Sequence, residues 1–223
     1  DREADTLKHR RLTGRITAAA LSAVMGCSGA FLYSAPPAYA AGYERVNGYY
    51  QMLDGTVIDG VVARGIDVSR WQGNIDWNAV AADDVEFVML GTRSKGAVDP
   101  YFHKNVKEAS DAGVRVGAYI YSLATTPQMA VEEADFVLDL VKDYPISFPI
   151  AFDAEDSSTL GSLPPAQVTE IINAFCERVE AAGYYPMVYA NDYWLANKID
   201  MSNMHYDVCL LYTSPSPRDR SVS

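Results

Sequence analysis

The feature that most constrains the fold is a regular alternation of short apolar runs with helical patterns between residues 65 and 208. Strands that alternate with helices form parallel sheets, because each helix returns the chain to the edge where the next strand begins. We expect strands at 65–69, 86–91, 115–122, 148–154 and 185–190, and a sixth that begins at Tyr206. Five βα units and the start of a sixth predict an α/β fold, a (β/α) TIM-like barrel that is incomplete in this sequence.

Proline and glycine mark the expected helix ends, since proline suits the first helical turn and glycine the residue after the last one. Asp99-Pro100 opens a helix that Gly113 ends, Thr126-Pro127 opens a second, and Pro164-Pro165 opens a third that Gly183 ends. In a barrel of this kind, functional side chains follow the C-terminal ends of the strands.

Both ends of the chain differ in composition from this central part. Residues 1–40 join basic side chains to an apolar segment and a small-x-small end, which predicts a secretory signal peptide. The apolar segment is long enough to cross a bilayer, so a membrane anchor is the alternative. The protein is therefore expected in the cell-wall zone outside the cell, or anchored to the outer face of the cytoplasmic membrane.

Residues 41–64, with a turn expected at Asp54-Gly55, predict a lead-in hairpin or linker. The barrel itself is expected at 65–208. Residues 209–223 change abruptly to Ser, Pro and Arg and match one reading frame of a sequencing-library adapter, which predicts an artefact of a broken contig. A genuine disordered tail is the alternative. If the artefact interpretation holds, the chain as given should be neither stable nor active, because the barrel lacks its last strands.

Charge and cysteine content exclude several classes of function. The formal net charge is −11, and an acidic domain repels nucleic acid and anionic membranes. Of three cysteines, only Cys176 lies inside the expected barrel, so a disulfide framework is excluded. The position of Cys176 in a helical apolar pattern predicts a buried structural thiol.

Motifs for other chemistries are missing from the sequence. The three histidines show no metal-ligand spacing, and the chain has neither a glycine-rich phosphate loop nor a GxSxG elbow. We therefore expect no cofactor and no metal.

A pair of carboxylates, Asp153 and Glu155, closes the apolar run at 149–152. Residues i and i+2 of a strand point to the same face, so the two charges should lie roughly 7 Å apart. Each raises the proton affinity of the other, so one can hold a proton near neutral pH while the other stays ionised. Carboxylates in these two states cleave glycosidic bonds. The alternative is that the pair only caps the following loop.

Other polar and aromatic residues follow the remaining strand ends. They are Asp67, Arg93, Tyr119, Tyr121, Tyr189 and Asn191. Trp71 and Trp194 fall in expected loops at the same rim, where aromatic rings can stack on sugars, although a lone Trp more often belongs to a core. Convergence of several strand ends on polar groups favours a functional site over separate capping residues.

The chain resembles glycoside hydrolase family 25, the Chalaropsis-type lysozymes, in five motifs that occur in the family's order. They are Gly65-Ile66-Asp67-Val68-Ser69-Arg70-Trp71-Gln72-Gly73, Asp99-Pro100-Tyr101-Phe102, Gly117-Ala118-Tyr119-Ile120-Tyr121-Ser122, Asp153-Ala154-Glu155 and Tyr185-Pro186-Met187-Val188-Tyr189. The resemblance covers about residues 65–208. Beyond them, the family's late-strand aspartate and its Trp-x-Ala-x-Tyr pattern are absent.

The resemblance implies an N-acetylmuramidase that cuts the β-1,4 bond between N-acetylmuramic acid and N-acetylglucosamine in peptidoglycan glycan strands. By this resemblance Glu155 is the catalytic acid, and Asp153 assists as nucleophile or as the group that orients the substrate acetamide. Asp67 belongs to the acidic cluster of the groove. Substrate binding is expected of Tyr121 and Tyr189 by the resemblance, and of Trp71, Asn191, Tyr119 and Arg93 by their places at strand ends.

Two other functions remain open from the sequence. One is an inactive or purely glycan-binding barrel. The other is a chitinase-like glycosidase, which is disfavoured because Ile150 and Ala151 stand where such enzymes place further aspartates. No protein partner is implied.

Overall fold

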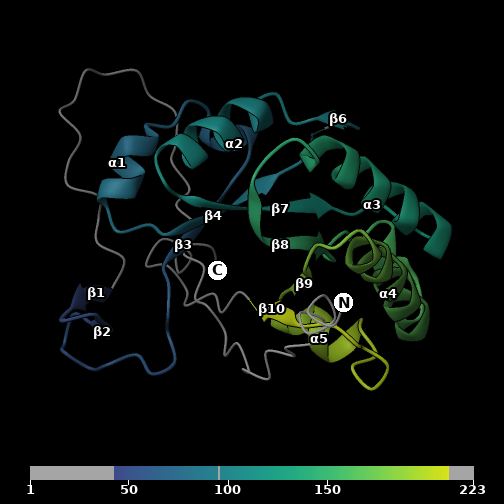
Figure 1. The fold of residues 1–223 in the computed structure, drawn as a ribbon. Helices are drawn as coiled ribbons and strands as arrows, with labels where there is room; N and C mark the ends of the chain where they lie inside the picture. Colours follow the sequence, from purple (N-terminus) through teal and green to yellow (C-terminus); the bar gives the residue numbers. More distant parts are fainter. Residues whose placement is uncertain (1–42, 95, 211–223) are drawn as a thin grey trace, which may run out of the picture.

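The computed structural model of the chain describes residues 43–94 and 96–210. Its centre is a curled sheet of six parallel strands, which lie side by side in sequence order (Figure 1). The strands are β3 (Gly65–Val68), β4 (Phe87–Gly91), β7 (Arg115–Tyr121), β8 (Ile146–Asp153), β9 (Pro186–Ala190) and β10 (Val208–Leu210). This is the strand order of an incomplete (β/α) barrel, so the expected fold class is confirmed.

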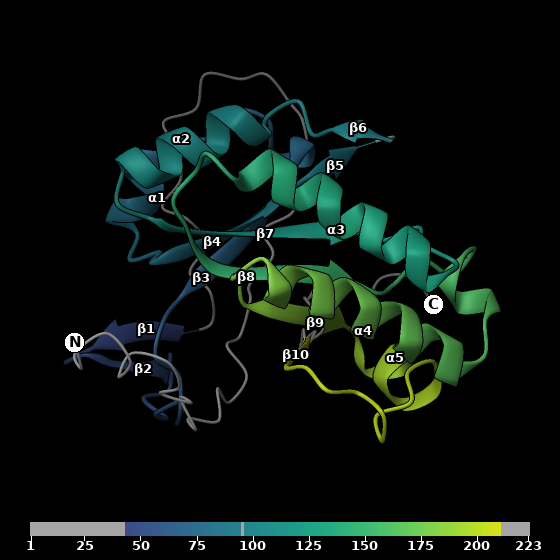
Figure 2. The ribbon, with the colours of Figure 1, turned by 45° about the vertical axis from the view of Figure 1, so that its right-hand side comes forward.

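Three long helices pack against one face of this sheet (Figure 2). They are α2 (Phe102–Asp111), α3 (Pro127–Val141) and α4 (Pro165–Ala181). Thr126 caps α3 by accepting a hydrogen bond from the Met129 N–H. Gly113 and Gly183 follow α2 and α4 with φ of 81° and 88°, a conformation that glycine adopts without strain. The helix starts predicted at Thr126-Pro127 and Pro164-Pro165 and the ends predicted at Gly113 and Gly183 are thus confirmed. The start predicted at Asp99-Pro100 is early, because α2 begins at Phe102.

Short elements fill the connections between the strands and the long helices. They are η1 (Arg70–Gln72), α1 (Trp77–Ala82), β5 (Arg93–Ser94), β6 (Ala97–Val98), η2 (Leu160–Ser162) and α5 (Asp192–Asn197). The expectation that Trp194 lies in a loop at the rim is wrong. Its side chain belongs to α5 and is only 3% exposed, because it packs into the main hydrophobic core.

The strands alternate their side chains between two faces, as the geometry of a β-strand requires. The face toward the helices carries the main core, in which the Phe152 ring of β8 meets the Phe175 ring of α4 at 5.1 Å. The opposite face carries a smaller cluster that includes Met89 and the stacked rings of Phe87 and Phe148. No helix among the described residues covers this second face, so its side chains can form a site at the C-terminal ends of the strands.

Close packing on that inner face depends on Gly117 in the middle of β7. A Cβ atom at this position would lie 2.5 Å from the Met89 sulfur and 2.7 Å from the Pro149 carbonyl oxygen. A side chain there would therefore push β7 and β8 apart.

The segment before the barrel forms the expected hairpin, from β1 (Tyr43–Val46) and β2 (Tyr49–Met52). Its turn is at Asn47-Gly48, where both residues have positive φ. Asp54-Gly55 forms a second turn, in which the Thr56 N–H donates to the Asp54 carboxylate. Arg45 then pairs with Asp84 and Glu86, which fixes the hairpin to the connection before β4.

Two of the expected segments, 1–40 and most of 209–223, lie outside the described residues. Within 43–94 and 96–210, no helix is both long and apolar enough to cross a membrane. Cys209 and Leu210 are described, and they continue β10 in parallel register with Tyr189 and Ala190 of β9.

Candidate active site

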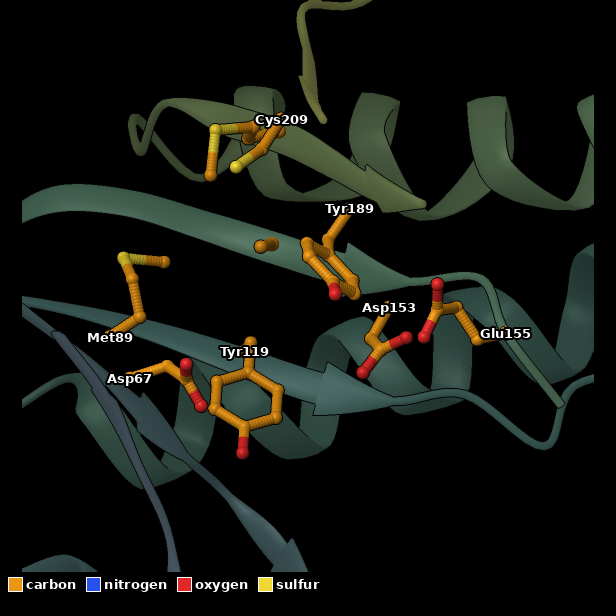
Figure 3. Close-up of a pocket in the computed structure, with 9 residues that line it drawn as sticks. Asp67, Met89, Tyr119, Asp153, Glu155, Tyr189 and Cys209 are labelled. Carbon is orange, nitrogen blue, oxygen red and sulfur yellow. The ribbon is translucent and has the colours of Figure 1, made fainter. Parts of the chain in front are cut away.

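A cavity of about 150 Å³ opens on the inner face, at the C-terminal ends of the strands (Figure 3). It is surrounded by side chains from β3, β4, β7, β8, β9 and β10 and by Glu155, which follows β8. The lining residues are Asp67, Met89, Tyr119, Ala151, Asp153, Glu155, Met187, Tyr189 and Cys209. Five of the residues predicted from the sequence therefore meet in one cavity: three carboxylic acids and two tyrosines.

Asp153 is the last residue of β8, and its side chain is nearly buried. Its buried Oδ1 has no hydrogen-bond partner among the described residues. Burial, followed by the charges of Glu155 and Asp67, raises the pKa of Asp153 to about 8. This carboxyl group therefore holds a proton near neutral pH.

Glu155 lies two residues beyond the end of β8 and is more exposed than Asp153. Its Oε1 accepts a hydrogen bond of 2.9 Å from the Asn191 N–H at the start of α5. Burial raises the pKa of Glu155, and the hydrogen bonds from Asn191 oppose that rise. The two carboxyls are thus placed in different environments, one dry and unpaired and the other hydrogen-bonded, which is how enzymes separate the roles of paired acids.

Asp67 faces the same cavity from β3, on the other side of the Tyr119 ring (Figure 3). Burial raises the pKa of Asp67, and its charge in turn raises the pKa of Asp153. A polar residue in this apolar strand therefore acts electrostatically on the carboxyl group at the end of β8.

Tyr119 and Tyr189 line the cavity between Asp67 and the carboxyl pair (Figure 3). Burial, and then the nearby carboxylates, raise the pKa of both phenols above the ordinary value. Both hydroxyls stay protonated at neutral pH, so each can donate a hydrogen bond to a ligand while its ring offers an apolar face.

Four other predicted residues lie outside the cavity lining. The Tyr121 hydroxyl donates to the Asp156 carboxylate at 3.2 Å, and burial followed by the Asp156 charge raises the pKa of Tyr121 to about 12. Trp71 is 76% exposed beneath the Arg70 guanidinium. The Asn191 side chain caps α5.

The Arg93 guanidinium is the fourth of these groups, and its charge is paired within the protein. It donates to the Glu133 carboxylate at 2.6 Å and to the Tyr121 carbonyl oxygen at 2.8 Å. Arg93 therefore links α3 to the end of β7 at the rim of the barrel, and it does not line the cavity.

Four further residues line the cavity, and sequence reasoning did not identify them. They are Met89, Ala151, Met187 and Cys209. Ala151 and Met187 stand two residues before Asp153 and Tyr189, so the two-residue period of a strand would have found them. Among the described residues, no group of three or more His, Cys, Asp or Glu side chains could hold a metal ion.

Residues 66–210 match the family model described as Glycosyl hydrolases family 25. This range contains all three carboxylic acids of the cavity. The chain belongs to glycosyl hydrolase family 25. The resemblance inferred from the five sequence motifs is thus confirmed.

Curated relatives of this family 25 chain match part of its length. It is 32% identical over 134 residues to protein YegX of Escherichia coli O157:H7, an alignment that covers 56% of this chain and 47% of YegX. It is 37% identical over 60 residues to Lysozyme M1 of Streptomyces globisporus, covering 26% of this chain and 20% of that lysozyme. The chain spans about half the length of the YegX relatives.

Solved structures share the fold of this family 25 chain. A family 25 glycosyl hydrolase from Bacillus anthracis superposes with a TM-score of 0.60 at 21% identity, covering 82% of this chain and 81% of that one. A muramidase from Trichobolus zukalii gives 0.55 at 21% identity, with 66% and 75% covered. The modular autolysin LytC from Streptococcus pneumoniae gives 0.56 at 21% identity, with 74% and 47% covered.

Proposed function

We propose that this family 25 barrel hydrolyses the β-1,4 bond between N-acetylmuramic acid and N-acetylglucosamine in peptidoglycan. The observation that carries the proposal is the carboxyl pair at the end of β8, in which Asp153 is buried without a partner for Oδ1 and has a pKa of about 8 beside Glu155. Such a pair supplies both a proton and a negative charge near neutral pH. The names of the structural relatives, a muramidase and an autolysin, point to the same substrate.

Within this proposal, Glu155 donates a proton to the leaving oxygen of the glycosidic bond. It is more exposed than Asp153, so a sugar oxygen can reach it, and burial raises its pKa in the direction that a general acid requires. Asp153 lies deeper and stabilises the reacting sugar, as nucleophile or by orienting the acetamide. Because the two groups interact, they titrate as a pair with one proton, which lies mainly on the buried Asp153 in the free protein. In this proposal the proton passes to Glu155 when substrate binds. That transfer leaves Asp153 ionised for its role and lets Glu155 protonate the leaving oxygen.

Asp67 and the two cavity tyrosines complete the proposed site. Asp67 disfavours ionisation of Asp153 by its charge. The protonated hydroxyls of Tyr119 and Tyr189 donate hydrogen bonds to sugar oxygens. Trp71, exposed at the rim, offers a ring face for a sugar further along the glycan strand.

We propose further that the enzyme acts outside the cytoplasmic membrane, where peptidoglycan lies. The composition of residues 1–40 supports export through a signal peptide, with membrane anchoring as the alternative. Fractionation of producing cells tests the choice. A product in the medium that begins at Ala41 supports export, and a membrane-bound product that retains residues 1–40 supports anchoring.

The chemistry is tested on the expressed and purified protein. Purified peptidoglycan is digested, the products are reduced with borohydride, and their reduced ends are identified by mass spectrometry. A muramidase yields only reduced N-acetylmuramic acid. Reduced N-acetylglucosamine would contradict the proposed bond, cleavage of chitin oligosaccharides would support the chitinase-like alternative, and binding without any cleavage would support a glycan-binding barrel.

A further inference from the structure

Glu133, on the second turn of α3, is a buried carboxylate outside the cavity and is only 7% exposed. It accepts three hydrogen bonds. Arg93 Nη2 donates to Oε1 at 2.6 Å, the Leu123 N–H donates to Oε1 at 3.0 Å, and Ser122 Oγ donates to Oε2 at 2.6 Å. Burying a carboxylate is costly, and three donors, one of them charged, offset that cost.

All three donors belong to or contact the same stretch of backbone, which is the end of β7 and the residues that follow it. Arg93 also donates to the Tyr121 carbonyl oxygen at 2.8 Å. The Ser122 hydroxyl, besides donating to Glu133, accepts the Ala124 N–H at 3.1 Å. The backbone of residues 121–124 is therefore tied to the Glu133 carboxylate directly, through the Ser122 hydroxyl and the Leu123 N–H, and indirectly through Arg93.

This stretch is joined directly to the proposed catalytic strand. The Ser122 N–H donates to the Asp153 carbonyl oxygen at 3.1 Å, and Tyr121 is the register partner of Asp153 in the sheet. The Asp153 Oδ1 has no hydrogen-bond partner among the described residues. The position of its carboxyl group consequently depends on its backbone, and that backbone is held by Ser122.

We propose that Glu133 is a positioning residue, which fixes the end of β7 and, through the Ser122 N–H, the placement of the Asp153 carboxyl against Glu155. The inference rests on the proposed glycosidase function and extends it to a residue that does not touch the cavity. A packing role alone would be met by an apolar side chain of similar size, whereas the carboxylate matches three donors in direction and number.

The test compares Glu133→Ala and Glu133→Gln with the parental protein. Each protein is assayed for muropeptide release well below its unfolding temperature. Small misplacements of catalytic groups lower kcat by up to about 100-fold. We expect Glu133→Ala to lower kcat about tenfold or more, with KM changed by less than about threefold. Glu133→Gln keeps an acceptor for Leu123 and a polar partner for Ser122, so it should recover kcat to within about threefold of the parent.

Asn105→Ala is the matched control. Its side-chain oxygen accepts a buried hydrogen bond from Trp77 Nε1 at 3.3 Å between α1 and α2, and neither residue lines the cavity. This variant should lower the unfolding temperature and leave kcat at the parental value. Ser122→Ala serves if Glu133→Ala does not fold, and it should lower kcat about threefold or more at parental KM.

Three results would overturn the positioning role. They are a destabilised Glu133→Ala variant with parental kcat, a variant whose loss lies only in KM, and a Gln variant as slow as the Ala variant. If only Ser122→Ala folds, parental kcat in that variant overturns it as well. A parental protein that releases no muropeptides refutes the proposed function itself, whereas an active parent with an unaffected variant refutes only the role of Glu133.

Discussion

At the scale of single residues, the buried carboxyl of Asp153 makes stability depend on pH. An aspartate in the unfolded chain has a pKa of about 3.9, and in the folded protein the pKa is about 8. Between these values the folded state binds more protons than the unfolded state, so stability falls as pH rises from about 4 to about 8. Asp153→Asn removes this effect, because the amide stays neutral.

We therefore expect Asp153→Asn to be more stable than the parent at pH 8, by up to a few kcal/mol, and similar to it near pH 4. Thermal unfolding across this pH range measures the difference. Asp139→Asn, an exposed change on α3, is the control and should shift little at either pH. An Asp153→Asn variant that is less stable than the parent at pH 8 would show that the carboxyl is not held protonated.

Asp67 acts on the same group through its charge. Its negative charge raises the pKa of Asp153, so Asp67→Asn should lower that pKa and move the alkaline limb of the kcat/KM profile to lower pH. The profile is measured for muropeptide release, with Asp139→Asn again as the control. An unchanged pH profile together with unchanged substrate affinity would remove Asp67 from the site.

At the scale of elements, Gly117 sets how closely β7 approaches its neighbours. Gly117→Ala would place Cβ 2.5 Å from the Met89 sulfur and 2.7 Å from a backbone oxygen of β8, and overpacking of this kind costs about 1–3 kcal/mol. At Gly161 the nearest atom would be 3.4 Å from Cβ, an ordinary contact, so Gly161→Ala should change stability by less than about 0.5 kcal/mol. Denaturant unfolding compares the two, and equal stabilities would contradict the packing described for β7.

Elements with strong local signals were predictable from the sequence. The apolar runs gave the six strands, and α3 begins at Pro127 as expected because the Thr126-Pro127 pair specifies a helix start locally. The helices α1 and α5 were missed because each is six residues long and carries no such proline or glycine signal. Trp194 was placed in a loop because its burial depends on packing against distant parts of the core.

In the candidate site too, some residues could be predicted from local signals and others depend on long-range packing. Asp67, Asp153 and Glu155 could be found because a charged residue at the end of an apolar strand is a local signal. The pairing of Arg93 with Glu133 could not, because it joins residues 40 positions apart and depends on how α3 packs. Arg93 was therefore assigned to substrate, although its charge is satisfied within the protein.

At the scale of the whole molecule, parallel strands bring their C-terminal ends to one rim, and the long helices of the described residues pack on the outer face. The inner face is thereby left for side chains that meet from six strands, and three of these side chains are carboxylic acids. The family 25 barrel thus keeps ionisable groups in a partly dry cavity that is open at one end, which suits acid catalysis on a long glycan strand.

The central claim is that the carboxyl pair of Asp153, which ends β8, and Glu155, which follows it, performs glycoside hydrolysis, and Glu155→Gln tests it most directly. The rate of release of reducing-end N-acetylmuramic acid from peptidoglycan is measured for the parental protein, for this variant and for Glu170→Gln, an exposed change on α4. We expect the Glu155→Gln rate to fall about 10²–10⁴-fold, the usual loss on removal of a general acid, and the Glu170→Gln rate to stay parental. A Glu155→Gln variant that retains near-parental activity would contradict the account.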